Sequence, residues 1–439
     1  MTIYQPDLYC ATEEFSLVGS QLNHTLQCGG VTIDSWIAAD PSLLSTPDPK
    51  GEWWKAYLRG AVPNSSSPNG VIRTVDLFCG PGGLALGVGQ LAAELGVDMV
   101  SELICDQDEG AVAVYSANHS TRLRSTNSVT SLVDFRWKGR SDQASFTYEP
   151  EIIDPLLADA LPNIDLVMAG PPCQGHSNLN NHTRRTDKRN ELYMTVPAFT
   201  FAVGARMAII ENVPTVVRDR MQVVETARAL FESAGYRVAT GVFGAHDMGW
   251  PQTRKRFFMV AHREADPIPF ADISRVLSEA RPRSLLWAIG DLADRTEGSI
   301  MYQPADLSSE NRARINWLFD NNRHELPPPE RPPSHQNGTS YGSVYGRMLE
   351  DRPAPTLTTG FMSPGRGRYV HPTRRRTLTL REAARIQGFP DNYRFVVTPK
   401  DPPPRTRIAQ WIGNAVPMPL GYAAALSVLA VDQRERWRT

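Results

Sequence analysis

The sequence lacks the features of a membrane-spanning or secreted protein. It has no apolar run long enough to cross a bilayer, and its first ten residues include Asp7 but no Lys or Arg. These absences argue against a transmembrane segment and a secretory signal. An excess of charge of one sign is also missing, because 46 Lys and Arg balance 47 Asp and Glu. A uniformly basic nucleic-acid coat is therefore excluded, whereas a local basic face is not.

Cysteine is scarce as well. The five cysteines are Cys10, Cys28, Cys79, Cys105 and Cys173, an odd number with no C-x-x-C spacing. This argues against a disulfide framework and a structural zinc site, predicts no metal, and fits a reducing cytosol. The simplest interpretation of any one cysteine is a small buried hydrophobe. Only Cys173 has surroundings that suggest more.

Apolar residues are present in sufficient number for a large core. Of the 439 residues, 41% are hydrophobic, and this length suits two or three domains. Short apolar runs alternate with helix-like segments; the expected strands are 71–78, 99–105, 164–169, 207–210 and 257–261, and the expected helices include 84–95 and 111–117. The alternation predicts an α/β fold, in which helices cover both faces of a parallel sheet and ligands bind at the carboxyl ends of strands.

Changes in composition divide the chain into four parts. Residues 1–70 form an N-terminal extension of unknown role, which ends in a turn-rich linker. Residues 71–265 contain the alternating α/β pattern. Residues 266–390 are irregular and polar and form a smaller domain, and residues 391–439 return to the main core, with a helix expected near the end.

The first chemical motif is the turn Asp76-Leu-Phe-Cys-Gly-Pro-Gly-Gly83, between an expected strand and an expected helix. Its glycines let a ligand approach the backbone closely, and the N-terminus of a helix favours an anionic group. The next strand ends at Asp106, a usual position for an acid that holds ribose hydroxyls. Taken alone, the pair is explained equally well by a structural glycine turn and a surface Asp.

Cys173 follows a buried strand within Ala169-Gly-Pro-Pro-Cys-Gln-Gly-His-Ser177. A nucleophile needs such a place, which is exposed, preorganised and close to cations. The stretch 178–193 is polar and basic, so it favours the thiolate and suits a polyanion. The plainer alternative is a loop cysteine beside a solvated basic segment, and the two preceding prolines disfavour it.

Two further strand ends carry charged residues. Glu211 directly follows the apolar run 207–210, and partial burial there favours a protonated carboxyl, a suitable acid partner for a cysteine. A helix-capping Glu is the plainer alternative. Arg254 and Arg256 fall on one face of an extended segment, where they suit a carboxylate, a phosphate or a base carbonyl. An ordinary charged strand edge explains them as well.

Taken in order, these motifs resemble those of the DNA (cytosine-5) methyltransferase family. The matching set is Asp-Leu-Phe-Cys-Gly-Pro-Gly-Gly, Pro-Pro-Cys-Gln-Gly, Glu-Asn-Val, Gln-Thr-Arg-Lys-Arg, Arg381-Glu-Ala-Ala-Arg-Ile-Gln-Gly-Phe-Pro390 and Gly413-Asn-Ala-Val-Pro417. The resemblance covers residues 71–429, and residues 266–346 fall where the family carries its target recognition region. The cysteine after Pro-Pro distinguishes the chain from amino-methyltransferases, which have an aromatic residue there.

The resemblance implies a Rossmann-like, S-adenosylmethionine-dependent catalytic domain over 71–265 and a target recognition domain over 266–390. Phe78 would stack on the adenine of the cofactor, Asp106 would hold its ribose, and Asn414 would line its methionine end. The other residues implied to contact the cofactor are Asp76, Gly80, Gly82, Gly83, Gln107 and Ser128. At Gln107 and Ser128 the chain departs from the family, which commonly has a large apolar residue and an Asp there.

The resemblance further implies that Cys173 is the nucleophile, that Glu211 acts at cytosine N3, and that Arg254 and Arg256 are active-site arginines. The residues implied to contact the substrate are Pro172, Gln174, Ser177 and Arg381. The implied reaction transfers a methyl group from S-adenosylmethionine to C5 of a cytosine flipped out of double-stranded DNA, through a covalent bond between Cys173 and C6. The same chemistry on RNA and a catalytically degenerate DNA-binding protein are the alternatives.

An arginine-rich stretch supports a nucleic-acid partner. Residues 347–385 contain nine Arg and three acidic residues, a balance that favours phosphate binding over a solvated face. Double-stranded DNA is the expected partner, and a cognate restriction endonuclease is a candidate second one. We expect a cytoplasmic, nucleoid-associated enzyme encoded by a bacterium or a phage.

Overall fold

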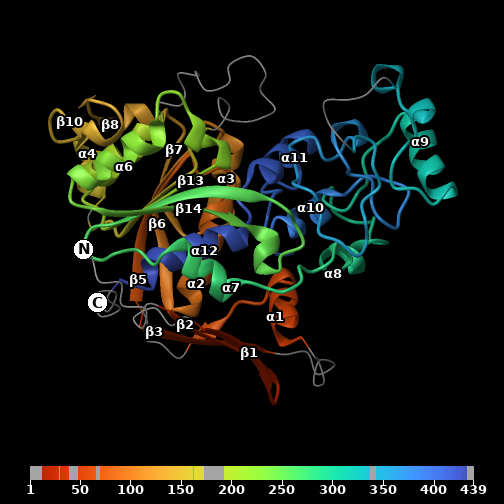
Figure 1. Cartoon of the computed structure of the whole chain (residues 1–439), viewed down its shortest axis with the longest axis horizontal. Helices are drawn as coiled ribbons and strands as arrows, with labels where there is room; N and C mark the ends of the chain where they lie inside the picture. The colour runs from red at the N-terminus through yellow and green to blue at the C-terminus, as the bar shows by residue number, and fades with distance from the viewer. Residues whose placement is uncertain are drawn as a thin grey trace. The chain divides into compact units, whose positions relative to one another are not determined.

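The computed structural model describes residues 12–28, 30–38, 48–65, 70–161, 163–172, 192–336 and 343–432. The chain forms two compact units, both drawn in Figure 1. The first unit contains residues 1–243, 255–278 and 418–439, and the second contains residues 244–254 and 279–417. Each unit is described separately below.

A seven-stranded sheet forms the centre of the first unit. Its strands are β5 (Gly70–Leu77), β6 (Val97–Cys105), β7 (Thr121–Ser125), β12 (Leu166–Ala169), β13 (Met207–Asn212), β14 (Arg237–Gly244) and β15 (Lys255–His262), in the spatial order β14-β15-β13-β12-β5-β6-β7. The pairs from β13 to β7 are parallel, and the α/β fold is confirmed. β15 differs from the parallel expectation, because it runs antiparallel to β13. Residues 245–254, which precede it, are too few for a helical crossover.

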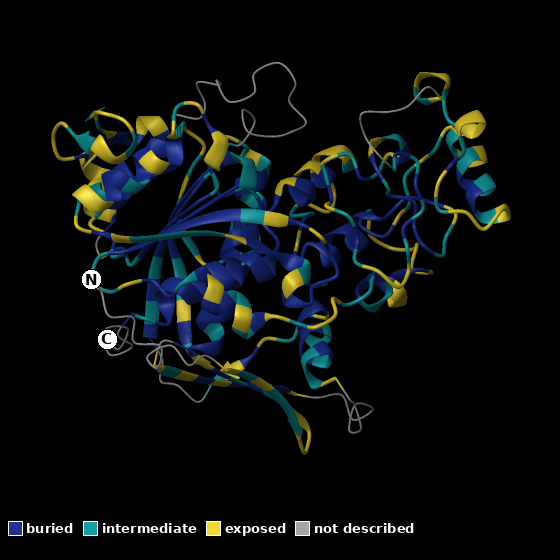
Figure 2. Ribbon diagram, viewed as in Figure 1, coloured by how far each residue is buried: buried dark blue, intermediate teal, exposed yellow. Residues whose placement is uncertain are grey.

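The centre of this sheet is fully buried. Every residue of β12 and β13 is buried (Figure 2), as expected of central parallel strands. The helices that follow these strands in the chain or pack beside them are α2 (Gly83–Glu94), α3 (Glu109–Asn118), α5 (Thr195–Ala202), α6 (Val223–Ser233), α7 (Phe270–Leu277) and α12 (Met418–Leu429). The backbones of α2 and α12 are in contact, since a Cβ built on Gly87 would lie 2.4 Å from the carbonyl oxygen of Met418.

Residues between β7 and β12 form a small irregular module of the first unit. Its elements are the antiparallel pairs β8 (Val133–Asp134) with β11 (Glu151–Ile152) and β9 (Trp137–Lys138) with β10 (Ser145–Phe146), followed by α4 (Pro155–Ala160). The ring of Phe146 lies 6.1 Å from that of Phe201 in α5. The backbone N–H of Ser141 donates to Thr226 Oγ1 in α6 at 3.1 Å. The module is therefore anchored on the two helices that precede and follow β13 in the chain.

The N-terminal extension is a folded part of the first unit. It contains an antiparallel sheet in the order β1-β2-β3-β4, made of β1 (Thr12–Val18), β2 (Gln21–Cys28), β3 (Val31–Ala38) and β4 (Asn64–Ser65), together with α1 (Pro49–Leu58). The side chain of Asp48 caps α1 by accepting a hydrogen bond from the Gly51 N–H at 2.8 Å. The ring of Trp54 contacts that of Tyr422 in α12, with centroids 6.0 Å apart.

The second unit is irregular, as its composition predicts. Its α-helices within the described residues are α8 (Leu285–Ile289), α9 (Ser309–Asp320), α10 (Leu380–Ile386) and α11 (Arg405–Asn414). A small cluster of buried residues, Ile315, Leu318, Leu326 and Val370, packs beneath α9. Much of the remaining chain is held by turns and by the polar contacts described below.

The unit boundaries differ from the positions expected from composition. Residues 266–278 belong to the first unit, where Phe270 stacks on Phe243 with ring centroids 4.6 Å apart. Residues 391–417 belong to the second unit, and the chain returns to the first only at Met418. Composition does not reveal that residues 266–278 belong to the first unit. The helix α7 in this segment exposes polar residues on one side, although its aromatic end is buried.

The single helix expected near the end of the chain is two helices. α11 ends at Asn414 and α12 begins at Met418. Pro417 lies between them and disfavours a helical conformation in the residue before it. Residues 405–429 together are long and apolar enough to cross a membrane, but 94% of the most apolar window is buried inside the protein, as in core helices.

Candidate active site

A strained turn follows the carboxyl end of β5. Phe78 has a φ of 57°, Gly80 of 52° and Gly82 of 90°, and α2 begins at Gly83. Positive φ is costly for an aromatic residue and persists where the surroundings enforce it, commonly at functional sites. A Cβ built on Gly80 would meet nothing within 4 Å, so this glycine serves the backbone conformation and leaves open space beside it.

Asp106 holds this turn from the neighbouring strand. Its Oδ2 accepts a hydrogen bond from the Gly80 N–H at 2.9 Å, and its Oδ1 accepts one from the Asp108 N–H at 2.9 Å. Asp76, at the end of β5, is buried, and its Oδ2 has no hydrogen-bond partner within the described chain. Burial raises the pKa of Asp76 well above its usual range, and the negative charge of Asp106 raises it further. A hydrogen bond from Tyr115 lowers the pKa but does not outweigh these two effects.

The remaining residues predicted to contact a cofactor in this unit follow the next strand ends. Gln107 comes directly after Asp106 and is exposed. Ser128 follows β7, where its hydroxyl lies 2.8 Å from Thr130 Oγ1. Phe78, Asp106 and Ser128 thus follow β5, β6 and β7, three adjacent parallel strands whose carboxyl ends lie at one edge of the sheet.

A second group of polar residues follows the carboxyl end of β13. The Nε of Arg256 lies 2.6 Å from Glu211 Oε1. Only 13% of the Arg256 side chain and 11% of the Glu211 side chain are exposed. The sequence suggested a protonated Glu211, but a guanidinium at this distance favours the charged carboxylate. Arg256 Nη1 donates to the carbonyl oxygen of Lys255 at 2.9 Å.

The segment leading to Cys173 is fixed beside this ion pair. Asn212 Nδ2 donates to the carbonyl oxygen of Pro171 at 3.3 Å. A Cβ built on Gly170 would lie 3.6 Å from Glu211 Oε2. Pro172 is half-buried. Asn212 belongs to the Glu-Asn-Val motif but was not among the predicted site residues. Its position directly after Glu211 is the signal that could have identified it. Three predicted residues, Cys173, Gln174 and Ser177, lie outside the described residues.

Three predicted site residues belong to the second unit. Arg254 is buried, and its Nη1 and Nη2 donate to the carbonyl oxygens of Leu357 at 2.6 Å and Gly413 at 3.0 Å. The prediction that Arg254 and Arg256 act on one face is not supported, because Arg254 holds the interior of the second unit and β15 begins only after it. Asn414 is exposed at the end of α11, and its role at the cofactor stays a prediction.

Arg381 is also an interior residue. It is 5% exposed, and it donates to the carbonyl oxygens of Pro390 at 3.0 Å and Tyr393 at 3.3 Å. Burial lowers the pKa of its guanidinium. These contacts disfavour the predicted role in substrate binding. They indicate instead that Arg381 holds the loop containing Pro390 and Tyr393 in place.

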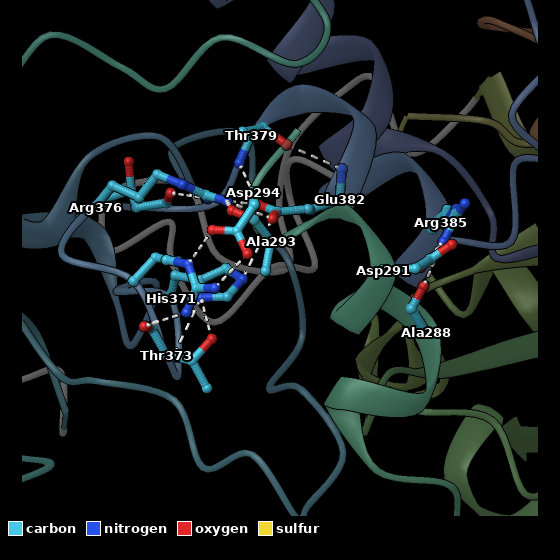
Figure 3. Close-up of polar contacts among 12 residues, drawn as sticks. Ala288, Asp291, Ala293, Asp294, His371, Thr373, Arg376, Thr379, Glu382 and Arg385 are labelled. Atoms are coloured by element: carbon cyan, nitrogen blue, oxygen red, sulfur yellow. Dashed lines mark hydrogen bonds and ion pairs between the residues drawn. The ribbon is translucent and has the colours of Figure 1, made fainter. Parts of the chain in front are cut away.

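Much of the arginine-rich stretch is likewise occupied within the second unit (Figure 3). Arg376 forms a bidentate pair with Glu382, with both N···O distances 2.7 Å. Arg385 pairs with Asp291 and Asp391, each at 2.5 Å. The prediction that this stretch as a whole forms a phosphate-binding wall therefore needs correction, because acidic residues of the same unit neutralise several of its charges.

Known proteins that resemble this chain identify its family. The profile of the family C-5 cytosine-specific DNA methylase matches residues 72–429. The Type II methyltransferase M1.BsuMI of Bacillus subtilis is 38% identical over 368 residues, which cover 84% of this chain and 82% of that protein. The Type II methylase M.HgiDII of Herpetosiphon aurantiacus is 30% identical, over 81% of this chain and 94% of that protein. The chain therefore belongs to the C-5 cytosine-specific DNA methylase family.

A solved structure supports the fold. The S. pombe Dnmt2 methyltransferase is 14% identical and has a TM-score of 0.52 over 83% of this chain and 100% of that one. The chain is thus a DNA (cytosine-5-)-methyltransferase that uses S-adenosylmethionine as its methyl donor. The predicted family, enzyme class and cofactor are confirmed.

The residues after β5, β6 and β7 suit this donor. S-Adenosylmethionine offers an adenine face, ribose hydroxyls and a charged methionine end. Phe78 provides a half-buried aromatic ring, and Asp106 a carboxylate that can accept from hydroxyls. Gly82 is the N-cap residue of α2 and provides no side-chain cap. The backbone N–H groups of the first turn are therefore available to a carboxylate. The donor set therefore fits the cofactor in its chemistry.

Proposed function

We propose that this enzyme methylates C5 of cytosine in double-stranded DNA by covalent catalysis, with Cys173 as the nucleophile. The observation that carries the proposal is the Glu211–Arg256 ion pair next to the anchored Pro171-Pro172 segment. Cys173 is the next residue in the chain. Glu211 in β13 and Arg256 in β15 supply a carboxyl group and a cation beside the segment that follows β12. A nucleophile, a carboxyl group and a cation are the groups that the reaction requires.

The chemistry assigns each group a task. Cytosine C5 is a poor nucleophile until the Cys173 thiolate adds to C6, and this addition places negative charge on the ring. Glu211 takes up a proton from solvent when the base enters and donates it in a hydrogen bond to N3, and Arg256 is directed at the base carbonyl. Together they stabilise the negative charge on the ring. S-Adenosylmethionine supplies the methyl group when it is bound. Loss of the C5 proton and departure of the thiolate then restore the aromatic ring.

Among the described residues, the contacts of Arg256 leave donors for the base. Its Nε serves Glu211 and its Nη1 serves the backbone, whereas a guanidinium carries five N–H groups in all. The ion pair also orients the fork of the guanidinium, so that less rotamer freedom is lost when a base binds.

The reaction further requires that the cytosine leave the DNA stack. C5 and C6 are inaccessible to a thiolate inside a duplex, so we propose that the enzyme flips the target base into the site. We propose that residues 279–390 of the second unit read the target sequence. A cognate restriction endonuclease is proposed as a partner, because relatives are named Type II methyltransferase and Type II methylase. We also propose a cytoplasmic location, which the bacterial origin of these relatives supports.

Duplex DNA that contains 5-fluorocytosine tests the covalent step. Fluorine at C5 cannot leave as a proton, so the intact enzyme should form a stable adduct in the presence of S-adenosylmethionine, whereas Cys173→Ala should form none. The same variant should retain DNA binding in a filter-binding assay. Turnover by Cys173→Ala would overturn the mechanism, and adducts on RNA in place of DNA would favour the RNA alternative.

A further inference from the structure

The N-terminal sheet carries a buried histidine. Residues 12–65 precede the region matched by the family profile, 72–429. In β2 the inward-facing positions are Leu22, His24, Leu26 and Cys28. His24 is therefore an imidazole at a position where the strand otherwise places apolar side chains, and it is fully buried.

Both ring nitrogens of His24 face carboxylates. Nε2 lies 3.2 Å from Glu13 Oε1, and Nδ1 lies 3.3 Å from Glu94 Oε2. A neutral imidazole has a proton on only one nitrogen, so its other nitrogen would place a lone pair against a carboxylate. The arrangement therefore selects the doubly protonated imidazolium. The rings of Phe15, 4.1 Å away, and Trp53, 5.3 Å away, enclose it.

Glu94 explains why a cation is needed at this point. It is the last residue of α2 and is fully buried. A negative charge at the C-terminus of a helix opposes the helix dipole, and burial adds a cost of desolvation. Three groups compensate: His24 Nδ1, the Tyr422 hydroxyl, which donates at 2.6 Å, and Gln90 Nε2, which donates at 2.8 Å. Among them only His24 can carry a charge that balances Glu94.

The other end of the same helix is the cofactor turn. α2 begins at Gly83, directly after the residues that suit S-adenosylmethionine. Gly87 in α2 lies against the backbone of α12, and Gly421 in α12 lies against Leu84, where a Cβ would be 2.9 Å from the carbonyl oxygen. These close contacts leave little room for sideways movement of α2. A polar anchor at its C-terminus then limits rotation and sliding along its axis.

We infer that His24 is a positioning residue for cofactor binding: its imidazolium, held between Glu13 and Glu94, fixes α2 and thereby the turn at the N-terminus of α2. The N-terminal sheet is accordingly the rear support of the cofactor site. Its role concerns the binding of the donor more than the chemical step at cytosine.

The inference has a pH dependence. Burial lowers the pKa of His24, but the charges of Glu94 and Glu13 outweigh burial and raise it from 6.5 to about 9. The other charged or titratable groups that face the cluster are Lys50, which pairs with Glu13 at 2.5 Å, Tyr422, and Cys28 nearby. Because the folded pKa is the higher one, the stabilisation is complete below about pH 6.5 and is lost as the pH rises through about 9.

The protonation state can be observed directly in the intact enzyme. Nitrogen-15 NMR of labelled histidine should show both nitrogens of His24 protonated at pH 7.5, with a transition near pH 9. His119 serves as an internal control, because burial lowers its pKa to about 4 and its ring should stay neutral throughout. A neutral His24 at pH 7.5 would overturn the inference.

Cofactor binding tests the positioning role. Calorimetry with S-adenosylhomocysteine should show about fivefold weaker binding for His24→Gln at pH 7.5. Combining it with Glu94→Gln removes the charge that needs a cation, so the double variant should recover to within about twofold of the unsubstituted enzyme. Thr25→Val, next to His24 but on the outer face of β2, is the matched control and should bind normally.

The pH profile keeps the inference testable if His24→Gln does not fold. In the unsubstituted enzyme the Kd for S-adenosylhomocysteine should rise about fivefold between pH 7.5 and pH 10, and this rise should be absent from the double variant. A purely structural role would lower the Tm without moving the Kd. Equal pH profiles in both proteins, or unchanged binding by a folded His24→Gln, would refute the positioning role.

Discussion

The guanidinium of Arg256 lies 2.6 Å from the carboxylate of Glu211, and the direction of β15 makes this pair possible. β15 runs antiparallel to β13, with Glu211 opposite Phe258. The first residues of β15 therefore lie beside the last residues of β13, at the edge of the sheet where the site is found. A parallel β15 would have carried Arg256 to the opposite edge.

The pair should behave as one unit in catalysis. Arg256→Ala leaves a largely buried carboxylate without its cation, and Glu211→Gln removes the group at N3, so each should lower the single-turnover rate of methylation by about 100-fold or more. The double variant should be no slower than the more impaired single variant. Arg237→Ala, whose pair with Asp266 is exposed, is the control and should react normally. Multiplicative effects would show that the two residues act separately.

The contact between α2 and α12 predicts opposite effects for two neighbouring glycines. A Cβ at Gly87 would lie 2.4 Å from the backbone of Met418, so Gly87→Ala should destabilise the protein by about 1–3 kcal/mol or more. Gly89 lies in the same helix, and a Cβ there would meet the Met99 side chain at 3.5 Å. Gly89→Ala should stabilise the protein by about 0.5–1 kcal/mol. Urea unfolding measures both, and equal effects would contradict the close contact.

Local patterns predicted the elements better than the long-range pairs. The buried strands and the polar residues after them were recognisable because apolar runs end at Asp76, Asp106 and Glu211. The direction of β15 was not recognisable, since it depends on a chain that leaves the first unit and returns. Similarly, Arg385 was counted in a phosphate-binding stretch because one of its partners, Asp291, lies 94 positions away in the sequence.

The role of the N-terminal extension was hidden for a related reason. Residues 1–70 carry no recognisable chemical motif, and nothing in the sequence around His24 distinguishes it from a satisfied core residue. Its significance comes from Glu94, which is 70 positions away in the helix expected over residues 84–95. No sequence pattern in either segment indicates that His24 and Glu94 are in contact.

The buried Glu382 should control the acid stability of the second unit. Burial raises the pKa of Glu382, but Arg376 and His371 outweigh burial and lower it from 4.5 to about 2. The stabilisation is therefore complete above about pH 4.5 and is lost as the pH falls toward 2. Glu382→Gln should destabilise the protein by about 3–5 kcal/mol at pH 7 by leaving Arg376 unpaired. The difference in Tm from the unsubstituted protein should narrow at pH 3.

Asp294 provides the comparison for that experiment. It pairs with Arg374 at 2.5 Å, but 81% of its side chain is exposed, and exposed pairs contribute little. Asp294→Asn should therefore leave the Tm nearly unchanged at both pH values. An equal loss of stability in Glu382→Gln and Asp294→Asn would mean that burial does not determine how much each ion pair stabilises the protein.

DNA binding should separate two exposed arginines of the stretch 347–385. Arg366 is exposed and forms no ion pair within the described residues, whereas Arg375 is exposed but pairs with Asp320 at 2.6 Å. Only an arginine without a carboxylate partner is ready to replace counterions on a phosphate. If this face binds DNA, Arg366→Gln should reduce the slope of log K against log salt by about 1, and Arg375→Gln should change it far less. Fluorescence anisotropy over a range of salt concentrations measures both slopes, and equal changes would show that DNA displaces the Asp320 pair or that neither arginine touches the backbone.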